Sequence, residues 1–182
     1  MTEILAMKFE PTPLAGAFVI EMQLFRDDRG FFSYSFDRGK FQQHGITADI
    51  VQSNLSFNLK KGTLRGMHFQ IEPRAQPKLV RCTAGAVYDV IVDLRVASPT
   101  FCKWFGVELS AENRRSLFIP AGFAHGFQTL SDNSELLYDM FEWYAPETAR
   151  GVRYNDPAFG IQWPLEISVI SERDATYADL QR

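Results

Sequence analysis

Side chains that could move a proton or hold an anion gather in the segment from Gly62 to Gln70. It contains His68, one of three histidines in the chain, and Arg65. On a regular β-strand alternate side chains share a face, so His68 and Gln70 point one way and Arg65 points the other. Arg65 joins that face only if Gly66 introduces a bulge. His68 is then either a base inside a barrel or an ordinary surface histidine.

A second segment, residues 50–58, alternates polar and apolar side chains. Gln52, Asn54, Ser56 and Asn58 share one face if the segment is a strand. Four amide or hydroxyl side chains on one face suit solvent, and they equally suit the lining of a site for a hydroxyl-rich ligand. The pattern alone does not choose between the two.

Ionisable residues follow the same strand spacing in two later segments. In residues 86–95, Asp89 and Asp93 share a face, which favours a polar interior and a salt-bridged outer surface equally. Residues 121–130 resemble the first segment, because they place His125 among glycines and aromatic side chains. These segments add candidate acids and bases to His68.

The composition excludes several classes of protein. A net charge of −3 argues against non-specific binding to nucleic acid or anionic membranes, which requires a basic surplus. Cys82 and Cys102 are too few for a disulfide framework, so we expect the reducing cytoplasm. Residues 1–9 lack the apolar core of a signal sequence, and no apolar run approaches the roughly 20 residues of a membrane span.

The expected elements are mostly short strands. Their predicted bounds are 15–24, 50–58, 62–70, 78–83, 86–95, 104–109, 116–120, 121–130 and 135–141. Residues 78–83 and 86–95 are predicted to form a hairpin about Ala84 and Gly85. A short helix is expected over 38–43, ending at His44 and Gly45. The pattern predicts one all-β domain spanning residues 1–182, a barrel or sandwich with one or two short helices.

An ordered set of motifs resembles one enzyme family from about Gly16 to Asp174. The motifs are DRGFF (28–32), QSNLS (52–56), LRGMHFQ (64–70), KLV (78–80), VDLR (92–95), SPT (98–100), PAGFAHGF (120–127) and YAP (144–146). Together they resemble the dTDP-4-dehydrorhamnose 3,5-epimerase family. The resemblance implies a cupin-type double-stranded β-helix, or jelly roll, that works as a homodimer with no metal and no cofactor.

The residues agree with the implied absence of a metal. A cupin metal site needs two histidines one residue apart, a carboxylate and a third histidine, whereas Phe69 and Gln70 follow His68 here. The other histidine of the motifs, His125, stands alone in its segment.

The implied substrate is a nucleotide diphosphate linked to a 4-keto-6-deoxyhexose. Its C4 carbonyl acidifies the protons on C3 and C5, so removing either proton gives an enolate. Reprotonation from the opposite face then inverts the carbon. Such an enzyme needs a base on one face of the sugar, an acid on the other, and a cation or donor at the C4 oxygen.

The resemblance also implies a role for individual residues. His68 is the base, Asp174 orients it, Tyr138 is the acid on the opposite face, and Lys78 with His125 stabilises the enolate. Asp89 is a candidate partner for His125. The implied substrate contacts are Arg29 and Arg65 to the diphosphate, Gln52 and Asn54 along the sugar or nucleotide, and Gln70, Tyr144 and Arg173.

Four positions depart from the family pattern. Tyr34 and Ala149 stand where glutamate is usual, Asp139 stands where lysine is common, and Arg173 replaces a lysine. We expect these positions in the nucleotide pocket or at its rim. Two alternatives therefore stay open: an epimerase acting at C3, C5 or both on a CDP- or GDP-linked sugar, and a non-catalytic protein that binds a sugar nucleotide.

Overall fold

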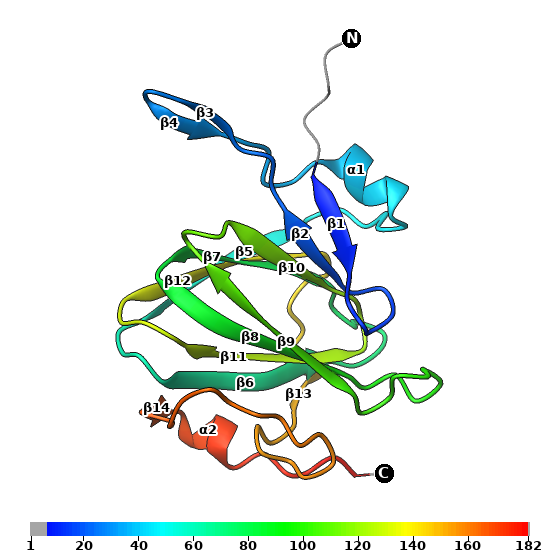
Figure 1. Ribbon diagram of the computed structural model, residues 1–182. Coiled ribbons are helices and arrows are strands. Elements are labelled where there is room, and N and C mark those ends of the chain that lie inside the picture. The colour runs from blue at the N-terminus through cyan, green and yellow to red at the C-terminus, as the bar shows by residue number, and fades with distance from the viewer. Residues whose placement is uncertain (1–6, 182) are drawn as a thin grey trace.

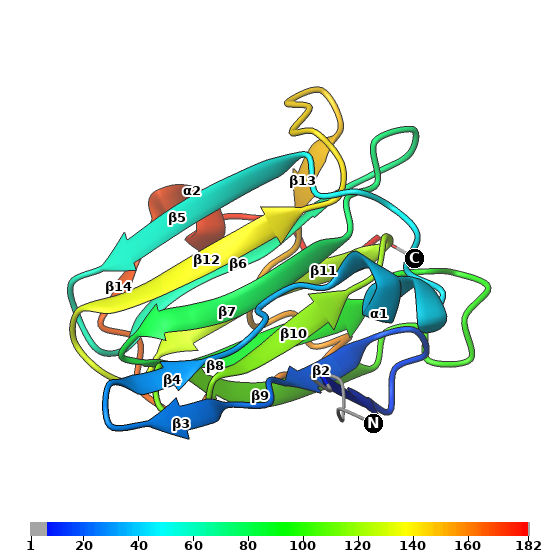
Figure 2. The ribbon, with the colours of Figure 1, turned by 90° about the horizontal axis from the view of Figure 1, so that it is seen from above.

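Two β-sheets face one another in the computed structural model, which describes residues 7–181 (Figure 1). The first sheet runs in the order β1 (Lys8–Pro11), β2 (Phe18–Glu21), β10 (Arg115–Ile119), β7 (Lys78–Ala84), β12 (Ser134–Met140) and β5 (Gln52–Asn58). The second runs in the order β13 (Ala149–Gly151), β6 (Thr63–Gln70), β11 (Phe123–Thr129), β8 (Ala86–Asp93) and β9 (Trp104–Ser110). Figure 2 shows the first sheet face-on, with β5 at its edge.

The strands from β5 to β12 have the order of a jelly roll. One sheet contains β5, β12, β7 and β10, and the other contains β6, β11, β8 and β9. Among these strands, only β8 and β9 are consecutive in the chain and paired in the same sheet. Every other connection crosses between the sheets, which is how a jelly roll wraps its chain. The predicted all-β, cupin-type jelly roll is confirmed.

The hairpin predicted about Gly85 is wrong. β7 pairs with β10 and β12, whereas β8 pairs with β11 and β9, so the two strands lie in different sheets. Gly85 has φ +70°, and a short turn through that conformation carries the chain across the sandwich. A tight turn between two strand-like runs has the same sequence signature whether the strands pair or separate.

A layer of apolar side chains fills the space between the sheets. It includes Val80, Val87, Ile91, Leu117 and Leu136, all fully buried. The other face of β8 is covered too, because Val90 and Val92 pack beneath the C-terminal segment. Burial on both faces explains why six of the eight residues of β8 are apolar.

The predicted helix over 38–43 is confirmed as α1 (Arg38–Gln43). Asp37 caps it by accepting a hydrogen bond from the backbone N–H of Lys40, and Phe41 anchors it in an aromatic cluster outside the first sheet. Before α1, β3 (Phe25–Asp27) and β4 (Gly30–Phe32) form a hairpin that projects from the sandwich (Figure 1).

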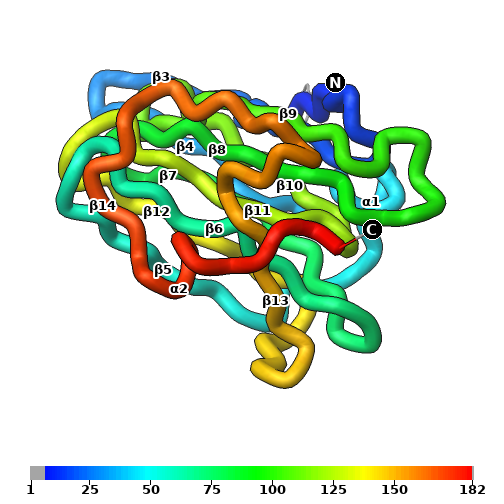
Figure 3. The backbone as a smooth tube through the Cα atoms, turned by 90° about the horizontal axis from the view of Figure 1, so that it is seen from below, coloured from blue at the N-terminus to red at the C-terminus, as the bar shows by residue number. Residues whose placement is uncertain are grey.

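The C-terminal segment crosses the outer face of the second sheet (Figure 3). There β14 (Val169–Ile170) pairs in parallel with β6, and α2 (Glu172–Ala175) follows with Ser171 as its cap. Asp156 holds the last part of this segment, because its carboxylate accepts a hydrogen bond from the backbone N–H of Leu180. The pairing of this segment with β6 places Asp174 beneath that strand. No helix within residues 7–181 is both long and apolar enough to cross a bilayer.

The backbones of β6 and β11 approach closely at two glycines. A Cβ atom placed on Gly66 would lie 2.5 Å from Cα of Gly126 and 2.8 Å from the carbonyl oxygen of His125. Gly66 also has φ +114°, a conformation that side chains disfavour. Both observations make glycine necessary at position 66.

Replacing Gly66 with alanine should therefore destabilise the fold strongly. Positive φ costs about 1–2 kcal/mol, and overpacking in a region with no room to relax adds roughly 1–3 kcal/mol. Gly30→Ala is a matched control, because Gly30 has φ +128° but a Cβ atom there would meet nothing within 4 Å. Urea unfolding should show a clearly larger loss for Gly66→Ala, and equal losses would disprove the steric argument.

Candidate active site

A β-bulge brings Arg65 and His68 to the same cleft. His68 pairs with His125 across β6 and β11, and Arg65 pairs with Phe127. β6 thus advances three residues while β11 advances two, and the extra residue lies at Gly66 or Met67. Arg65 and His68 both line the cleft, as the sequence predicted for a bulge at Gly66.

The cleft lies between the sheets and has two lobes that share Asn54, His68, Lys78 and Met140. The first, here the His125 lobe, has a volume of about 240 Å³ and is further lined by Leu55, Ser56, Arg65, His125, Gly126, Phe127 and Tyr138. The second, here the Tyr144 lobe, has a volume of about 210 Å³ and is further lined by Gln52, Phe69, Gln70, Gln76, Tyr144, Ala149, Arg150 and Arg173. The shared residues make the two lobes one continuous cleft.

Asp174 fixes the imidazole of His68. Its Oδ1 lies 2.7 Å from Nε2 of His68, and its Oδ2 accepts a hydrogen bond of 3.0 Å from the backbone N–H of Gly66. Burial tends to raise the pKa of Asp174, but these hydrogen bonds outweigh burial and lower it. An ionised carboxylate only accepts, so Nε2 carries a proton and the lone pair of neutral His68 lies on Nδ1.

A second histidine and carboxylate lie deeper in the cleft. Nε2 of His125 is 3.0 Å from both oxygens of Asp89, and both side chains are almost fully buried. This contact confirms Asp89 as the partner of His125. Burial lowers the pKa of His125, against the opposing effect of Asp89, so the neutral imidazole is favoured. The carboxylate of Asp89 belongs to the polar interior of the sandwich.

Lys78 and Tyr138 come from the first sheet and face these histidines. Burial lowers the pKa of Lys78 from 10.5 to about 8, and Asp89 opposes the shift. Burial also raises the pKa of Tyr138 far above its usual 10, so its hydroxyl keeps its proton. The ring of Tyr138 meets that of His125 edge-on, with centroids 5.9 Å apart. Groups from the two sheets therefore converge on one space.

The polar face predicted for residues 50–58 does line the cleft. Nε2 of Gln52 donates to Oδ1 of Asn54 over 2.7 Å, and Ser56 lies further along the same wall. Asn58 is buried, and its Oδ1 accepts a 2.7 Å hydrogen bond from Nε of Arg65. Asn58 was not predicted as a site residue, although the alternation that included it was the available signal.

The amide of Gln70 is engaged by backbone groups. Its Nε2 donates to the carbonyls of Arg74 and Trp143, and its Oε1 accepts from the N–H of Ala145. Gln70 thereby clamps the loop that carries Tyr144, whose side chain is exposed at the mouth of the cleft. Its place in the cleft wall agrees with the prediction, but its hydrogen bonds serve the loop.

Arg29 is the one predicted contact that the structure leaves outside the cleft. It lies in the turn of the β3–β4 hairpin, where its guanidinium pairs with Asp27 over 2.5 Å and is largely exposed. Arg173, by contrast, lines the Tyr144 lobe as predicted. Arg150 lines this lobe too and was missed, because a lone arginine outside any recognised motif carries no sequence signal.

One departure from the family pattern was placed wrongly. Asp139 follows Tyr138 on β12, so its side chain points to the outer face of the sheet. There it pairs with Arg81 and accepts a 2.7 Å hydrogen bond from Ser53. It is therefore not at the rim of a nucleotide pocket. Ala149 does line the Tyr144 lobe. Tyr34 contacts Phe32 edge-on and lies outside both lobes.

Within residues 7–181, no three His, Cys, Asp or Glu side chains gather closely enough to hold a metal ion. The histidines of the cleft are instead paired one to one, His68 with Asp174 and His125 with Asp89. The absence of a metal remains a prediction from the sequence.

A jelly roll with acidic and basic groups between its sheets is typical of cupin-type enzymes. A sequence profile described as dTDP-4-dehydrorhamnose 3,5-epimerase matches residues 11–182. The chain belongs to this family, and it is an isomerase. The resemblance stated from the motifs is confirmed.

Individual relatives match over nearly the whole chain. A dTDP-4-dehydrorhamnose 3,5-epimerase of Sinorhizobium fredii is 45% identical over 98% of this chain and 92% of its own length. The crystal structure of a Bacillus anthracis epimerase with TDP and PPi bound has a TM-score of 0.93 and 44% identity, covering 96% of this chain and 100% of that one. A Legionella pneumophila epimerase in complex with dTDP-4-keto-L-rhamnose has a TM-score of 0.90 and 42% identity, covering 96% of this chain and 93% of that one.

The environment of Lys78 predicts a titration near neutral pH. Burial disfavours the ammonium, so Lys78 should lose its proton near pH 8. Asp89→Asn should move the pKa lower still, because it removes the charge that favours the ammonium. Titration of 13Cε-labelled lysines by NMR would test this, with Lys78→Met to assign the signal. Asp132→Asn, at an exposed turn where Asp132 accepts from the N–H of Lys61, should leave the titration unchanged. A Lys78 signal titrating near 10.5 would contradict the prediction.

Proposed function

We propose that this chain inverts C3 and C5 of dTDP-4-dehydro-6-deoxy-D-glucose to give dTDP-4-dehydro-L-rhamnose. The observation that carries the proposal is the placement of His68 and Tyr138 on facing sheets, across one cleft. A sugar ring between them has a base on one face and an acid on the other, which is what inversion requires. The bound dTDP sugar of the Legionella relative supports the same substrate class.

The proposed reaction has two proton transfers at each carbon. Nδ1 of His68 takes the proton from C3 or C5 as the C–H bond breaks, and the electron pair moves to the C4 oxygen as an enolate. Asp174 stabilises the imidazolium that forms. Tyr138 then gives its hydroxyl proton to the opposite face of the same carbon. Solvent then returns a proton to the tyrosinate of Tyr138 and accepts the proton from the imidazolium of His68, so no other reactant is needed.

Lys78 is the proposed donor to the enolate oxygen. It is a buried cation at the junction of the two lobes, where low polarity strengthens its attraction for a developing negative charge. Neutral His125 donates its Nε2 proton to Asp89, so its other ring nitrogen can only accept a hydrogen bond. His125 can therefore donate to the enolate oxygen only when it is protonated. The rate should fall as the pH rises past about 8, where Lys78 loses its charge.

The two lobes suit the two halves of a sugar nucleotide. The sugar would occupy the His125 lobe, and the nucleotide would extend along the Tyr144 lobe past Gln52 and Asn54. Arg65 in the first lobe and Arg173 in the second offer guanidinium groups to the diphosphate, and guanidinium forms paired hydrogen bonds with phosphate oxygens. Gln70 contributes by holding the Tyr144 loop.

Proton NMR in deuterium oxide tests the reaction directly. The enzyme is added to freshly prepared dTDP-4-dehydro-6-deoxyglucose and, in parallel, to its CDP and GDP counterparts. Deuterium entering both C3 and C5 of the dTDP sugar would support the proposal, and entry at one carbon would reduce it to a mono-epimerase. Exchange only with CDP or GDP would assign a different nucleotide. Binding without exchange in any of the three would favour the non-catalytic alternative.

His68→Asn should abolish exchange at both carbons, because asparagine cannot accept the proton. His44→Asn is a matched control: His44 is exposed at the end of α1, where it stacks on Phe9, and lies outside the cleft. This control should keep the wild-type exchange rate. Exchange that persists in His68→Asn would remove His68 as the base.

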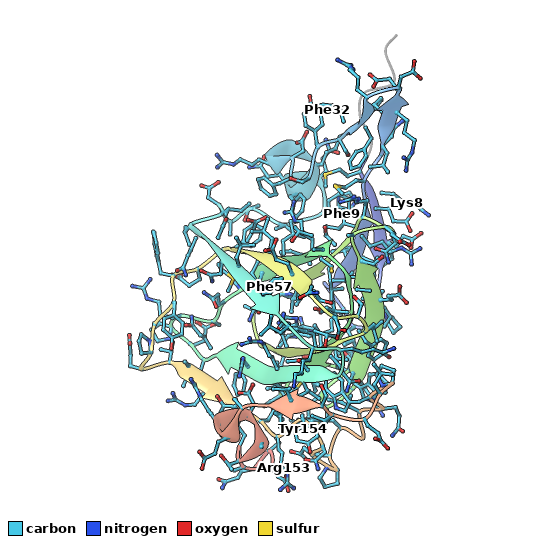
Figure 4. All side chains as sticks on the ribbon, turned by 90° about the vertical axis from the view of Figure 1, so that its left-hand side faces the viewer. Lys8, Phe9, Phe32, Phe57, Arg153 and Tyr154 are labelled. Carbon is cyan, nitrogen blue, oxygen red and sulfur yellow. The ribbon has the colours of Figure 1, made fainter. Side chains whose placement is uncertain are left out.

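We further propose that the enzyme is a homodimer in which Arg29 reaches the cleft of a second copy. The β3–β4 hairpin projects from the sandwich and exposes Phe31 and Phe32, and Figure 4 shows Phe32 far from the cleft strands. Exposed aromatic side chains on such an extension suit burial against another protein surface. Arg29 lies at the hairpin turn, where a copy of the chain could receive it.

Mixing two inactive variants tests this arrangement. Arg29→Ala should be weakly active alone, and His68→Asn should be inactive alone. If Arg29 acts on the second copy, an equilibrated equal mixture should recover roughly one quarter of wild-type activity, because half of the dimers contain one intact site. Sedimentation would verify the dimer. Absence of recovery in mixed dimers would show that Arg29 does not act across the interface.

A further inference from the structure

Tyr177 lies against the proposed base, although no sequence motif pointed to it. Its ring meets the imidazole of His68 edge-on, with centroids 5.9 Å apart and planes 75° apart. This is the favoured geometry for a pair of aromatic rings. The contact reaches a side of His68 other than its Nε2 edge, since Asp174 occupies that edge.

Gly151 makes room for this ring. Gly151 on β13 is the direct cross-strand partner of His68 on β6. A Cβ atom at position 151 would lie 2.2 Å from Cζ of Tyr177, so the tyrosine ring occupies the space that a side chain there would need. Tyr177 therefore reaches His68 only because its neighbour in the sheet is glycine.

The hydroxyl of Tyr177 does not explain its position. It is buried, and one polar side chain that interacts with it, the guanidinium of Arg173, makes no hydrogen bond of good geometry to it. Contacts of the ring must therefore hold the side chain in place. One of these contacts is the guanidinium of Arg173, whose Cζ lies 5.7 Å from the centre of the ring.

We propose that Tyr177 is a positioning residue for His68. With Asp174 holding Nε2 and Tyr177 holding the ring plane, the lone pair on Nδ1 keeps one direction toward the substrate. The side chain of His68 is 46% exposed, and its hydrogen bond to Asp174 alone does not fix the plane of the imidazole. His68 therefore needs this second support. The contact with Arg173 ties the same support to a residue of the Tyr144 lobe. This inference rests on the proposed role of His68 as the base.

Three variants distinguish the effect of the Tyr177 ring from that of its hydroxyl and from a general loss of stability. Tyr177→Ala should lower kcat for exchange about tenfold with little change in KM, because a misdirected base weakens the chemical step more than binding. Tyr177→Phe keeps the ring and should restore kcat to within about twofold of the wild type. Tyr154→Ala is the control, since Tyr154 is a partly buried tyrosine on the same C-terminal segment (Figure 4).

Gly151→Ala should lower kcat as Tyr177→Ala does, because the new methyl group at position 151 displaces the ring of Tyr177 from His68. The double variant Gly151→Ala with Tyr177→Ala should then be no worse than either single variant within about twofold, since both remove one interaction. Losses that multiply would show that the two positions act independently and would overturn the proposal.

A spectroscopic measurement tests the positioning without turnover. In 15N-labelled enzyme the imidazole nitrogen shifts report which nitrogen carries the proton, and His44 and His125 are internal references. Neutral His68 should carry its proton on Nε2 in the wild type and in Tyr177→Phe. In Tyr177→Ala the freed ring should leave its hydrogen bond with Asp174 part of the time, so both neutral forms should appear. Unchanged His68 shifts and unchanged kcat in Tyr177→Ala would overturn the proposal. Exchange that persists in His68→Asn would instead show that His68 is not the base. Failure of the role proposed for Tyr177 can therefore be told apart from failure of the proposed function.

Discussion

The bulge at Gly66 is the constraint on which the site depends. It brings Arg65 to the face of β6 that carries His68, and it leaves the backbone N–H of Gly66 free to bind Asp174. The close approach of Gly126 on β11 excludes any side chain at position 66. A single backbone irregularity therefore orients a proposed substrate contact and holds the partner of the base.

Depth in the cleft gives neighbouring groups different protonation behaviour. The side chain of His68 is half-exposed and is hydrogen-bonded to the ionised carboxylate of Asp174, so solvent can reach its imidazole. Lys78, His125 and Tyr138 are buried, which lowers the pKa of the first two and raises that of the third. Burial thus keeps Tyr138 protonated, as an acid must be before it acts, while the cation of Lys78 gains strength from its apolar surroundings.

Several site residues could be predicted from the chain because local spacing controls the face of a strand. The alternation in residues 50–58 predicted that Gln52 and Asn54 share a face, and the family resemblance assigned that face to the substrate. The spacing in 86–95 put Asp89 and Asp93 on one face, and the resemblance then proposed Asp89 as the partner of His125. The same rule, applied one residue beyond Tyr138, would have placed Asp139 on the outer face, where it pairs with Arg81. There the family pattern misled, because it records which residue is usual and not which way it points.

By itself, the sequence determined the strand-rich class, the helix at 38–43, the family and most of the candidate residues. These depend on short-range periodicity and on ordered motifs, which need no knowledge of distant contacts. Only the tertiary structure decided that β7 and β8 lie in different sheets, that Arg29 lies outside the cleft, and that Tyr177 meets His68. Each of these depends on contacts between residues far apart in the chain, whose energy comes from burial and close packing rather than from local preference.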